Sequence, residues 1–113
     1  MADDCLFCRI VRGEIPAKIV AETDTAVAFR DIDPRAPVHV LVIPREHVVS
    51  LSETRDPALV GELALLAAQI AAREGIAESG YRTVINTNSD AGQSVPHLHL
   101  HLLGGRAMGW PPG

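Results

Sequence analysis

The most informative stretch of the chain is HLHLHLL at residues 97–103. Polar and apolar residues alternate in it with period two, so a strand here would carry leucines on one face and three imidazoles on the other. Histidines two apart would stand about 6.7 Å from one another along such a strand. Because three of the chain's five histidines fall in this run, we expect a functional row rather than a half-solvated strand face that happens to be histidine.

A row of histidines suits chemistry at phosphorus. A neutral imidazole is a nucleophile or proton carrier near neutral pH, and an acceptor at its far nitrogen orients it. Directly upstream, DAGQSV at residues 90–95 is a glycine-containing turn whose amide and hydroxyl donors suit phosphate oxygens. A catalytic metal bound by the row is a rival interpretation, but histidines on one strand cannot all converge on an ion without a neighbouring strand.

The composition describes one small domain. The chain has 113 residues, of which 47% are hydrophobic, 21% charged and 4% aromatic, which predicts a single domain over residues 1–113 with an aliphatic core. A formal net charge of −4 provides no basic field for long nucleic acid. The amino terminus lacks the pattern of a secretory signal, and no apolar run approaches the roughly 20 residues that cross a bilayer, so we expect a cytoplasmic protein without membrane contact.

Residues that start or end helices and strands predict the remaining elements. Apolar residues at helical spacing stop before Gly13, and Asp56-Pro57 is a typical helix start. The β-branched run before Pro44 suits a central strand buried on both faces. Leu65 lies off the apolar stripe of its helix and hints at a dimer contact. The predicted elements are a short helix or turn over 4–12, strands over 19–22, 26–30 and 39–43, the main helix over 57–73, a strand over 81–87, a polar loop over 88–92 and the last strand over 97–103.

Two cysteines, Cys5 and Cys8, have the spacing of half a zinc site, and histidines could supply the other half. They are too close together to close a useful disulfide loop. A redox pair is a second interpretation, although that motif is expected at a helix start after a strand, and no strand precedes residue 5. Two inert small hydrophobic residues beside Phe7 are the third.

The histidine row resembles the signature of the histidine triad (HIT) superfamily. The similarity extends over nearly the whole chain and is greatest to the Hint branch of that superfamily, and the carboxyl-terminal tail is particularly similar to the purine nucleoside phosphoramidases of that branch. The segments that carry the resemblance are EIPAK at 14–18, AFRDI at 28–32, APVHVLVIP at 36–44, GQSV at 92–95, the row at 97–103 and GGRAMGWPPG at 104–113.

The resemblance implies a fold, an assembly and an activity. The implied fold is α+β, an antiparallel sheet of about five strands with one long helix and one short amino-terminal helix. Two copies would pair as a two-fold homodimer with a continuous sheet. The implied activity is hydrolysis of purine nucleoside 5′-phosphoramidates, and more slowly of acyl-nucleotides, releasing the amine and AMP or GMP.

The resemblance also implies roles for single residues. His99 matches the nucleophile that forms a nucleotidyl-imidazole intermediate, and its far nitrogen needs an acceptor that sequence does not identify. His101 and Ser94 match contacts to phosphate and leaving group, Ser94 helping to protonate the amine, and His39 matches a supporting histidine. The other implied nucleotide contacts are Asp31 for the ribose, Asn86, Gly92 and Gln93 for the phosphate, Leu6, Phe7, Ile10, Phe29 and Ile32 for the purine, and Trp110 from the neighbouring subunit.

On zinc, branches of the superfamily differ. Relatives with paired amino-terminal cysteines hold a structural zinc with a set that corresponds here to Cys5, Cys8, His47 and His97, whereas phosphoramidases with this tail often lack both cysteines and metal. Four such ligands would make a closed structural site. No cofactor is expected in the chemical step. The alternative function is an AMP-binding regulatory or adaptor protein with little turnover.

Overall fold

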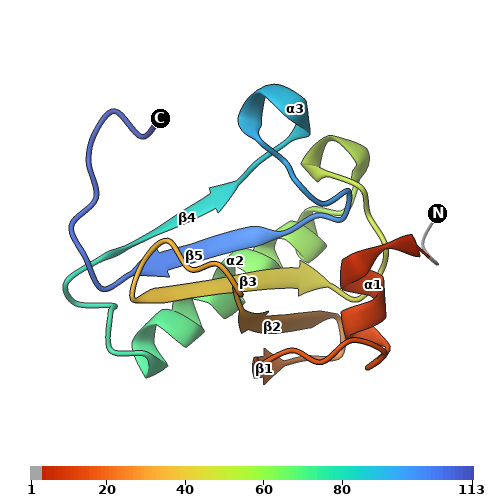
Figure 1. Ribbon diagram of the computed structural model, residues 1–113, viewed down its shortest axis with the longest axis horizontal. Helices are drawn as coiled ribbons and strands as arrows, with labels where there is room; N and C mark the ends of the chain where they lie inside the picture. The colour runs from red at the N-terminus through yellow and green to blue at the C-terminus, as the bar shows by residue number, and fades with distance from the viewer. Residues whose placement is uncertain (1–3) are drawn as a thin grey trace.

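A five-stranded antiparallel sheet in the order β1-β2-β3-β5-β4 organises the computed structural model, which describes residues 4–113 (Figure 1). The α+β class and the long and short helices are as expected. The first three residues of the stretch inspected for a signal lie outside the described residues. The elements are α1 Leu6–Val11, β1 Ile19–Glu22, β2 Ala26–Arg30, β3 Val38–Pro44, the 3-10 helix η2 Leu51–Glu53, α2 Pro57–Arg73, β4 Tyr81–Ile85, α3 Asn88–Ala91 and β5 Leu100–Gly104.

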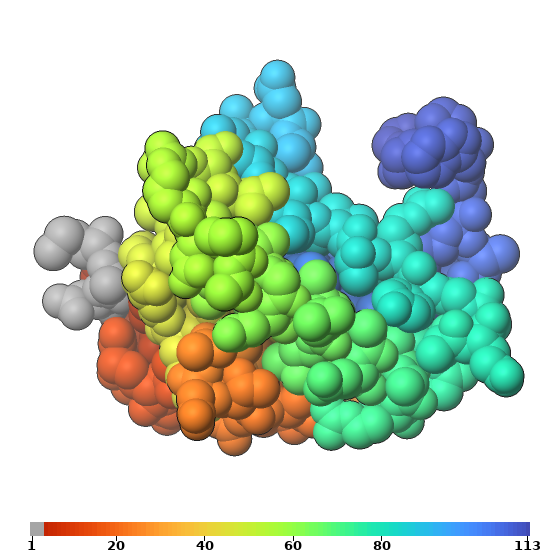
Figure 2. Space-filling view, turned by 180° about the vertical axis from the view of Figure 1, so that it is seen from behind, coloured from red at the N-terminus to blue at the C-terminus, as the bar shows by residue number. Residues whose placement is uncertain are grey.

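Helix α2 has the predicted bounds and covers one face of the sheet. The Asp56 side chain caps it by accepting from the backbone N–H groups of Ala58 and Leu59. Its apolar stripe, with Leu63 and Ile70 fully buried, packs on the sheet and builds the larger of two apolar clusters. Figure 2 shows α2, in green, lying across this face. Within residues 4–113, no helix is long and apolar enough to cross a membrane.

Strand β3 is the central strand and is buried on both faces, as predicted. Val40 and Val42 belong to the cluster beneath α2. Leu41 and Ile43, with the opposite orientation, belong to a second cluster that packs against α1. The alternation therefore divides the molecule into a purely structural face and a face on which α1 lies.

The histidine row is only partly a strand, which corrects the predicted strand over 97–103. Strand pairing begins at Leu100, opposite Val42 and Ile85. Before it, the Leu98 N–H donates instead to the Val48 carbonyl at 2.6 Å. The alternation of faces still holds, because the leucines at 98, 100 and 102 are buried beneath α2 while the three histidines face the other way.

Other boundaries also differ from the prediction: α1 spans Leu6–Val11 rather than residues 4–12, and β3 spans Val38–Pro44 rather than residues 39–43. Strand β4 ends at Ile85 rather than at residue 87, and the expected loop over 88–92 contains the single-turn helix α3. Gly92 ends α3 with φ of +84°, a left-handed conformation that costs glycine little, and its N–H donates to Ser89. The polar composition predicted a turn here but not its helical form.

Leu65 and Trp110 are among the large apolar side chains that stand exposed on the single chain. Leu65 is 67% exposed on α2, and Trp110 is 82% exposed on the tail. The tail projects from the body of the molecule (Figures 1 and 2). Both features are compatible with the predicted homodimer, which stays a prediction.

Candidate active site

The face opposite α2 holds a cavity of about 290 Å³ between α1, the sheet and the loop before β5. His99 and His101 line it, together with Ser94 from the loop and Asp31 from the end of β2. Nine of the predicted site residues therefore meet at one cavity. Its lining comprises Leu6, Phe7, Ile10, Ile15, Pro16, Ala17, Phe29, Arg30, Asp31, Ile32, Leu41, Ser94, Val95, His99 and His101.

His99 is oriented by its own chain. It is 3% exposed, and its Nδ1 lies 2.7 Å from the carbonyl oxygen of His97. Since a carbonyl only accepts, Nδ1 carries the proton and donates it, which leaves the lone pair of the neutral ring on Nε2. The acceptor that the sequence could not identify is thus a backbone group two residues away, and Nε2 has the electronic state of a nucleophile.

His101 is oriented from behind by His39. The Arg35 backbone N–H donates to His39 Nδ1 at 3.0 Å, so the neutral His39 ring carries its proton on Nε2. That Nε2–H donates to His101 Nδ1 at 2.9 Å. His101 in turn holds its proton on Nε2, as a donor suited to a phosphate or leaving-group oxygen. His39 itself is buried, does not line this cavity and is connected to it through His101.

Burial keeps this histidine pair neutral. Burial, followed by repulsion from His99 and His39, lowers the pKa of His101 to about 4. Burial also lowers the pKa of His39, and the Asp31 carboxylate opposes that shift in part. Near pH 7 both rings are therefore uncharged, and the direction of donation along the chain of hydrogen bonds is fixed by backbone groups.

One end of the cavity is apolar, and aromatic and aliphatic side chains together form this slot. The rings of Phe7 and Phe29 meet edge to face with centroids 5.4 Å apart, and Phe7 also contacts the His99 ring at 5.2 Å. Leu6 and Ile10 of α1 line the slot, and Ile32, fully exposed, stands at its rim. Flat apolar walls beside an imidazole suit a stacked aromatic base.

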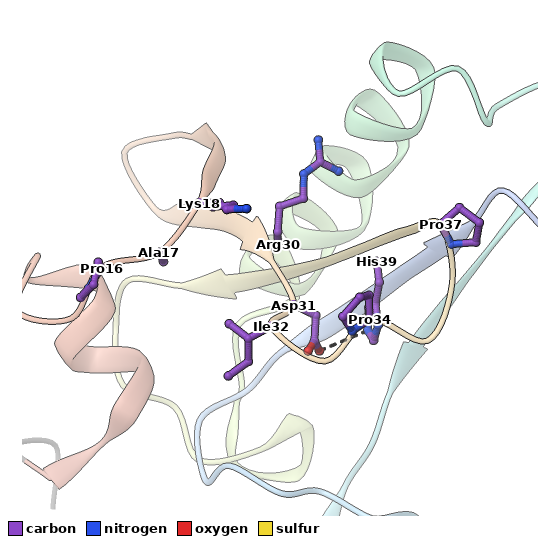
Figure 3. A pocket seen from close by; sticks show the side chains of 9 residues that line it. All are labelled: Pro16, Ala17, Lys18, Arg30, Asp31, Ile32, Pro34, Pro37 and His39. Atoms are coloured by element: carbon purple, nitrogen blue, oxygen red, sulfur yellow. Dashed lines mark ion pairs between the residues drawn. The ribbon is translucent and has the colours of Figure 1, made fainter.

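Asp31 lies where the cavity adjoins a second, wider hollow of about 700 Å³. Figure 3 shows the Asp31 carboxylate pointing toward His39, whose Nε2 lies 3.4 Å from Oδ2. The other oxygen, Oδ1, accepts from the Asp33 N–H at 2.8 Å. Both contacts hold the carboxylate at the boundary of the two hollows, within reach of a ligand in either.

The loop before β5 brings only part of its predicted donor set to the cavity. Gly92 and Gln93 use their N–H groups on the carbonyls of Ser89 and Asn88, and the Gln93 amide bonds the Val49 and Val95 carbonyls. Within residues 4–113, the Ser94 hydroxyl and N–H donate to no protein group, so both are available to a ligand. Asn86 and Trp110 do not line the cavity of the single chain.

A second cluster lies beside the cavity and contains Cys5, Cys8, His47 and His97, with one ligand atom of each within 4.8 Å of the others. His97 Nδ1 lies 3.3 and 3.5 Å from the sulfurs of Cys5 and Cys8, and His47 Nδ1 lies 3.2 Å from Cys8 Sγ. Neighbouring ligand atoms around a tetrahedral zinc lie about 3.3–3.8 Å apart, given its usual bond lengths.

The proton arrangement of this cluster also fits a metal. His97 Nε2 lies 2.9 Å from the Pro44 carbonyl, so it carries the proton and leaves Nδ1 free to ligate. The Cys8 N–H points at Cys5 Sγ. Burial lowers the pKa of His97, which keeps its ring neutral. Two sulfurs and two imidazole nitrogens make a closed structural donor set, and the interpretation as two inert hydrophobic residues loses support.

A further group, Asp31, His39 and His101, also has its ligand atoms within 4.8 Å of one another. It does not fit a cation, because the Arg35 N–H occupies His39 Nδ1 and the proton therefore sits on the atom that would have to ligate. This protonation state argues against the rival interpretation of the row as a catalytic metal site.

The chain is similar to known proteins in sequence and in fold. The HIT domain family matches residues 12–108. A purine nucleoside phosphoramidase of Escherichia coli is 49% identical over 112 residues, 96% of this chain and 93% of that protein. A HIT family hydrolase from Legionella pneumophila Philadelphia 1 superposes with a TM-score of 0.95 at 50% identity, covering 97% of this chain and 100% of that one. A zinc-bound histidine triad family protein from Mycobacterium smegmatis superposes with a TM-score of 0.85 at 35% identity, covering 94% and 78%.

Proposed function

This chain belongs to the HIT domain family, and we propose that it hydrolyses the P–N bond of purine nucleoside 5′-phosphoramidates as a single HIT domain over residues 1–113. The observation that carries the proposal is the hydrogen bond from His99 Nδ1 to the His97 carbonyl, which leaves a nucleophilic Nε2 in a buried ring at the cavity. The phosphoramidase of Escherichia coli, similar over nearly its whole length, supports the same substrate class.

The proposed reaction has two displacements. His99 Nε2 attacks the α-phosphorus, the P–N bond breaks, and the amine leaves with a proton delivered by the Ser94 hydroxyl. Water then attacks the nucleotidyl-histidine and gives a proton back to the Ser94 oxygen, the bond from phosphorus to Nε2 breaks, and AMP or GMP is released. His101 Nε2–H and the Ser94 N–H stabilise the negative charge on the phosphoryl oxygens in both steps.

Binding of the nucleotide uses the rest of the cavity. The purine lies between the aromatic and aliphatic walls around Phe7, and Asp31 accepts hydrogen bonds from the ribose hydroxyls. We also propose that the chain is a homodimer in which the partner brings Trp110 to the site, with Asn86 and the residues at 92–93 on the phosphate side. This is consistent with the exposed tail.

We further propose a structural Zn²⁺ held by Cys5, Cys8, His47 and His97, supported by the donor set and by the zinc-bound relative. The metal would stabilise the fold by tying α1 to the sheet. The catalytic residues need no cofactor for the displacements above. A cytoplasmic location completes the proposal, since a reducing compartment keeps both cysteines available as ligands.

The test is release of a fluorescent amine from an adenosine 5′-phosphoramidate, with His99→Ala alongside. Wild-type protein should release the amine, and the variant should lose on the order of 10³-fold or more in kcat, because the covalent path is gone. Its AMP affinity and its unfolding temperature should change little. Absence of release by wild-type protein that still binds AMP would favour the adaptor function, and normal turnover by the variant would exclude the covalent mechanism.

A further inference from the structure

His97 belongs to the Cys/His cluster and also contacts the cavity residue His99. Its ring belongs to the Cys/His cluster, where Nδ1 faces both sulfurs and Nε2 donates to Pro44. Its carbonyl oxygen accepts the proton that orients His99. The ring is fully buried and makes contacts at both of its nitrogens.

The backbone around His97 and His99 is not held by the sheet. The ladder of β5 begins at Leu100, and the two preceding histidines lie outside it. Between Pro96 and Leu100, the backbone is fixed by the His97 N–H on Val95 and the Leu98 N–H on Val48. The His97 side chain is therefore one of few anchors of the carbonyl that positions the nucleophile.

Phe7 makes a second connection between the clusters. It lies on the chain between Cys5 and Cys8, so the two thiol ligands flank it. Its ring centroid lies 5.9 Å from that of His97 and 5.2 Å from that of His99. The ring also forms a wall of the proposed base slot. Ligation of the two cysteines would thus fix the ring that borders both nucleophile and base.

We propose that His97 and Phe7 are positioning residues that couple the metal cluster to the nucleotide site. Metal held by the four ligands fixes the His97 carbonyl and the Phe7 ring, so metal occupancy raises both nucleotide affinity and kcat beyond its effect on folding. The inference rests on the proposed function. Because linkage is reciprocal, bound AMP must tighten the metal by the same factor by which the metal tightens AMP.

The experiment measures that linkage without turnover. The Zn²⁺ affinity of the protein is determined by competition with a chromophoric chelator, with and without saturating AMP, at a temperature where circular dichroism shows the metal-free protein to be folded. We expect AMP to tighten Zn²⁺ about 5- to 50-fold, within the usual range of coupling between sites. Equal Zn²⁺ affinities would overturn the coupling, whereas failure to bind AMP would instead overturn the proposed function.

Two variants separate positioning from general stability. Phe7→Leu keeps an apolar residue on α1 but removes the ring contacts, and it should reduce the linkage at saturating AMP by at least about twofold, leaving the part that the His97 carbonyl carries. Leu63→Val loosens the opposite face of the sheet beneath α2 and should leave the linkage unchanged. Equal loss of linkage in both variants would mean that stability alone is measured and would contradict the proposal.

A spectroscopic arm covers the case in which the metal-free protein unfolds. Co²⁺ in a site with two sulfurs and two nitrogens has ligand-field absorption bands that report ligand geometry. Addition of AMP to the Co²⁺-loaded protein should shift these bands, since the nucleotide contacts rings that also contact His97. Bands that stay constant while AMP binds would overturn the coupling.

Discussion

His97 and His99 stand two residues apart on the same side of the chain, yet they have opposite protonation patterns. His97 donates from Nε2 to the Pro44 carbonyl and presents Nδ1 to two sulfurs. His99 donates from Nδ1 to the His97 carbonyl and presents Nε2 to the cavity. The two residues are of the same type and belong to the same alternating run. The backbone acceptor that each ring meets decides which nitrogen keeps a lone pair, and this suits His97 to the proposed role of metal ligand and His99 to that of nucleophile.

The Cys/His cluster should contribute far more to the free energy of unfolding than the histidines of the cavity do, and this is the largest expected effect. Cys5→Ser combined with Cys8→Ser should lower the free energy of unfolding by more than about 3 kcal/mol, because metal binding energy is folding energy. Chemical denaturation of protein with known zinc content measures it. A chelator should lower the stability of the wild type but not that of the variant. Equal denaturation curves, with no zinc in the purified wild type, would exclude the structural site.

His39→Ala tests whether His39 orients the His101 ring at the cavity. Without the Nε2–H of His39, the His101 ring can adopt the tautomer that presents a lone pair to the phosphate, and kcat should fall about 10- to 100-fold, the usual cost of losing a partner that orients an imidazole. Arg35→Ala is the matched control, since Arg35 donates to His39 through its backbone N–H, which the substitution keeps. Similar kcat values in both variants would remove His39 from its positioning role.

Ser94→Ala should have a smaller effect that depends on the leaving group. Loss of the hydroxyl should slow release of a poor leaving group, such as an alkylamine, at least about tenfold more than release of an activated arylamine, because only the poor one needs a proton in the transition state. Ser89→Ala, on the exposed turn α3, should change neither rate. Equal losses with both amines would remove Ser94 from proton delivery.

The last prediction concerns the pH dependence of the free energy of unfolding. The pKa of His101 is lowered to about 4 from the ordinary 6.5, so between these values the unfolded chain binds the proton that the folded chain does not. Stability should therefore rise with pH through this window and be lost on acidification. Denaturation at a series of pH values should show a shallower dependence for His101→Gln. Identical slopes in the two proteins would contradict the buried neutral ring.

The sequence predicts those parts of the fold that depend on pattern. The apolar stripe and Asp56-Pro57 define α2 by its exact bounds, and the run before Pro44 defines a strand buried on both faces. The start of β5 at Leu100 was not predictable, because strict alternation gives no sign that Leu98 pairs with Val48 instead of the sheet. The helical turn α3 was missed because a polar turn sequence suits either form.

For the site, the sequence predicts side chains and misses backbone. The histidines, Asp31 and Ser94 were identified as residues, and nine of the predicted site residues line one cavity. The groups that fix the tautomers are the Arg35 N–H and the carbonyls of Pro44 and His97. Nearly every residue has a backbone N–H and a carbonyl, so the residue types do not indicate which of these groups contact the histidine rings. Only the fold shows them.

The most direct test of the opposite protonation patterns is long-range ¹⁵N–¹H correlation NMR of the histidine side chains in zinc-loaded protein at neutral pH. His99 should carry its proton on Nδ1, with an unprotonated Nε2, while His101 and His97 should carry theirs on Nε2. A His99 ring with its proton on Nε2 would contradict the assignment of that nitrogen as the nucleophile.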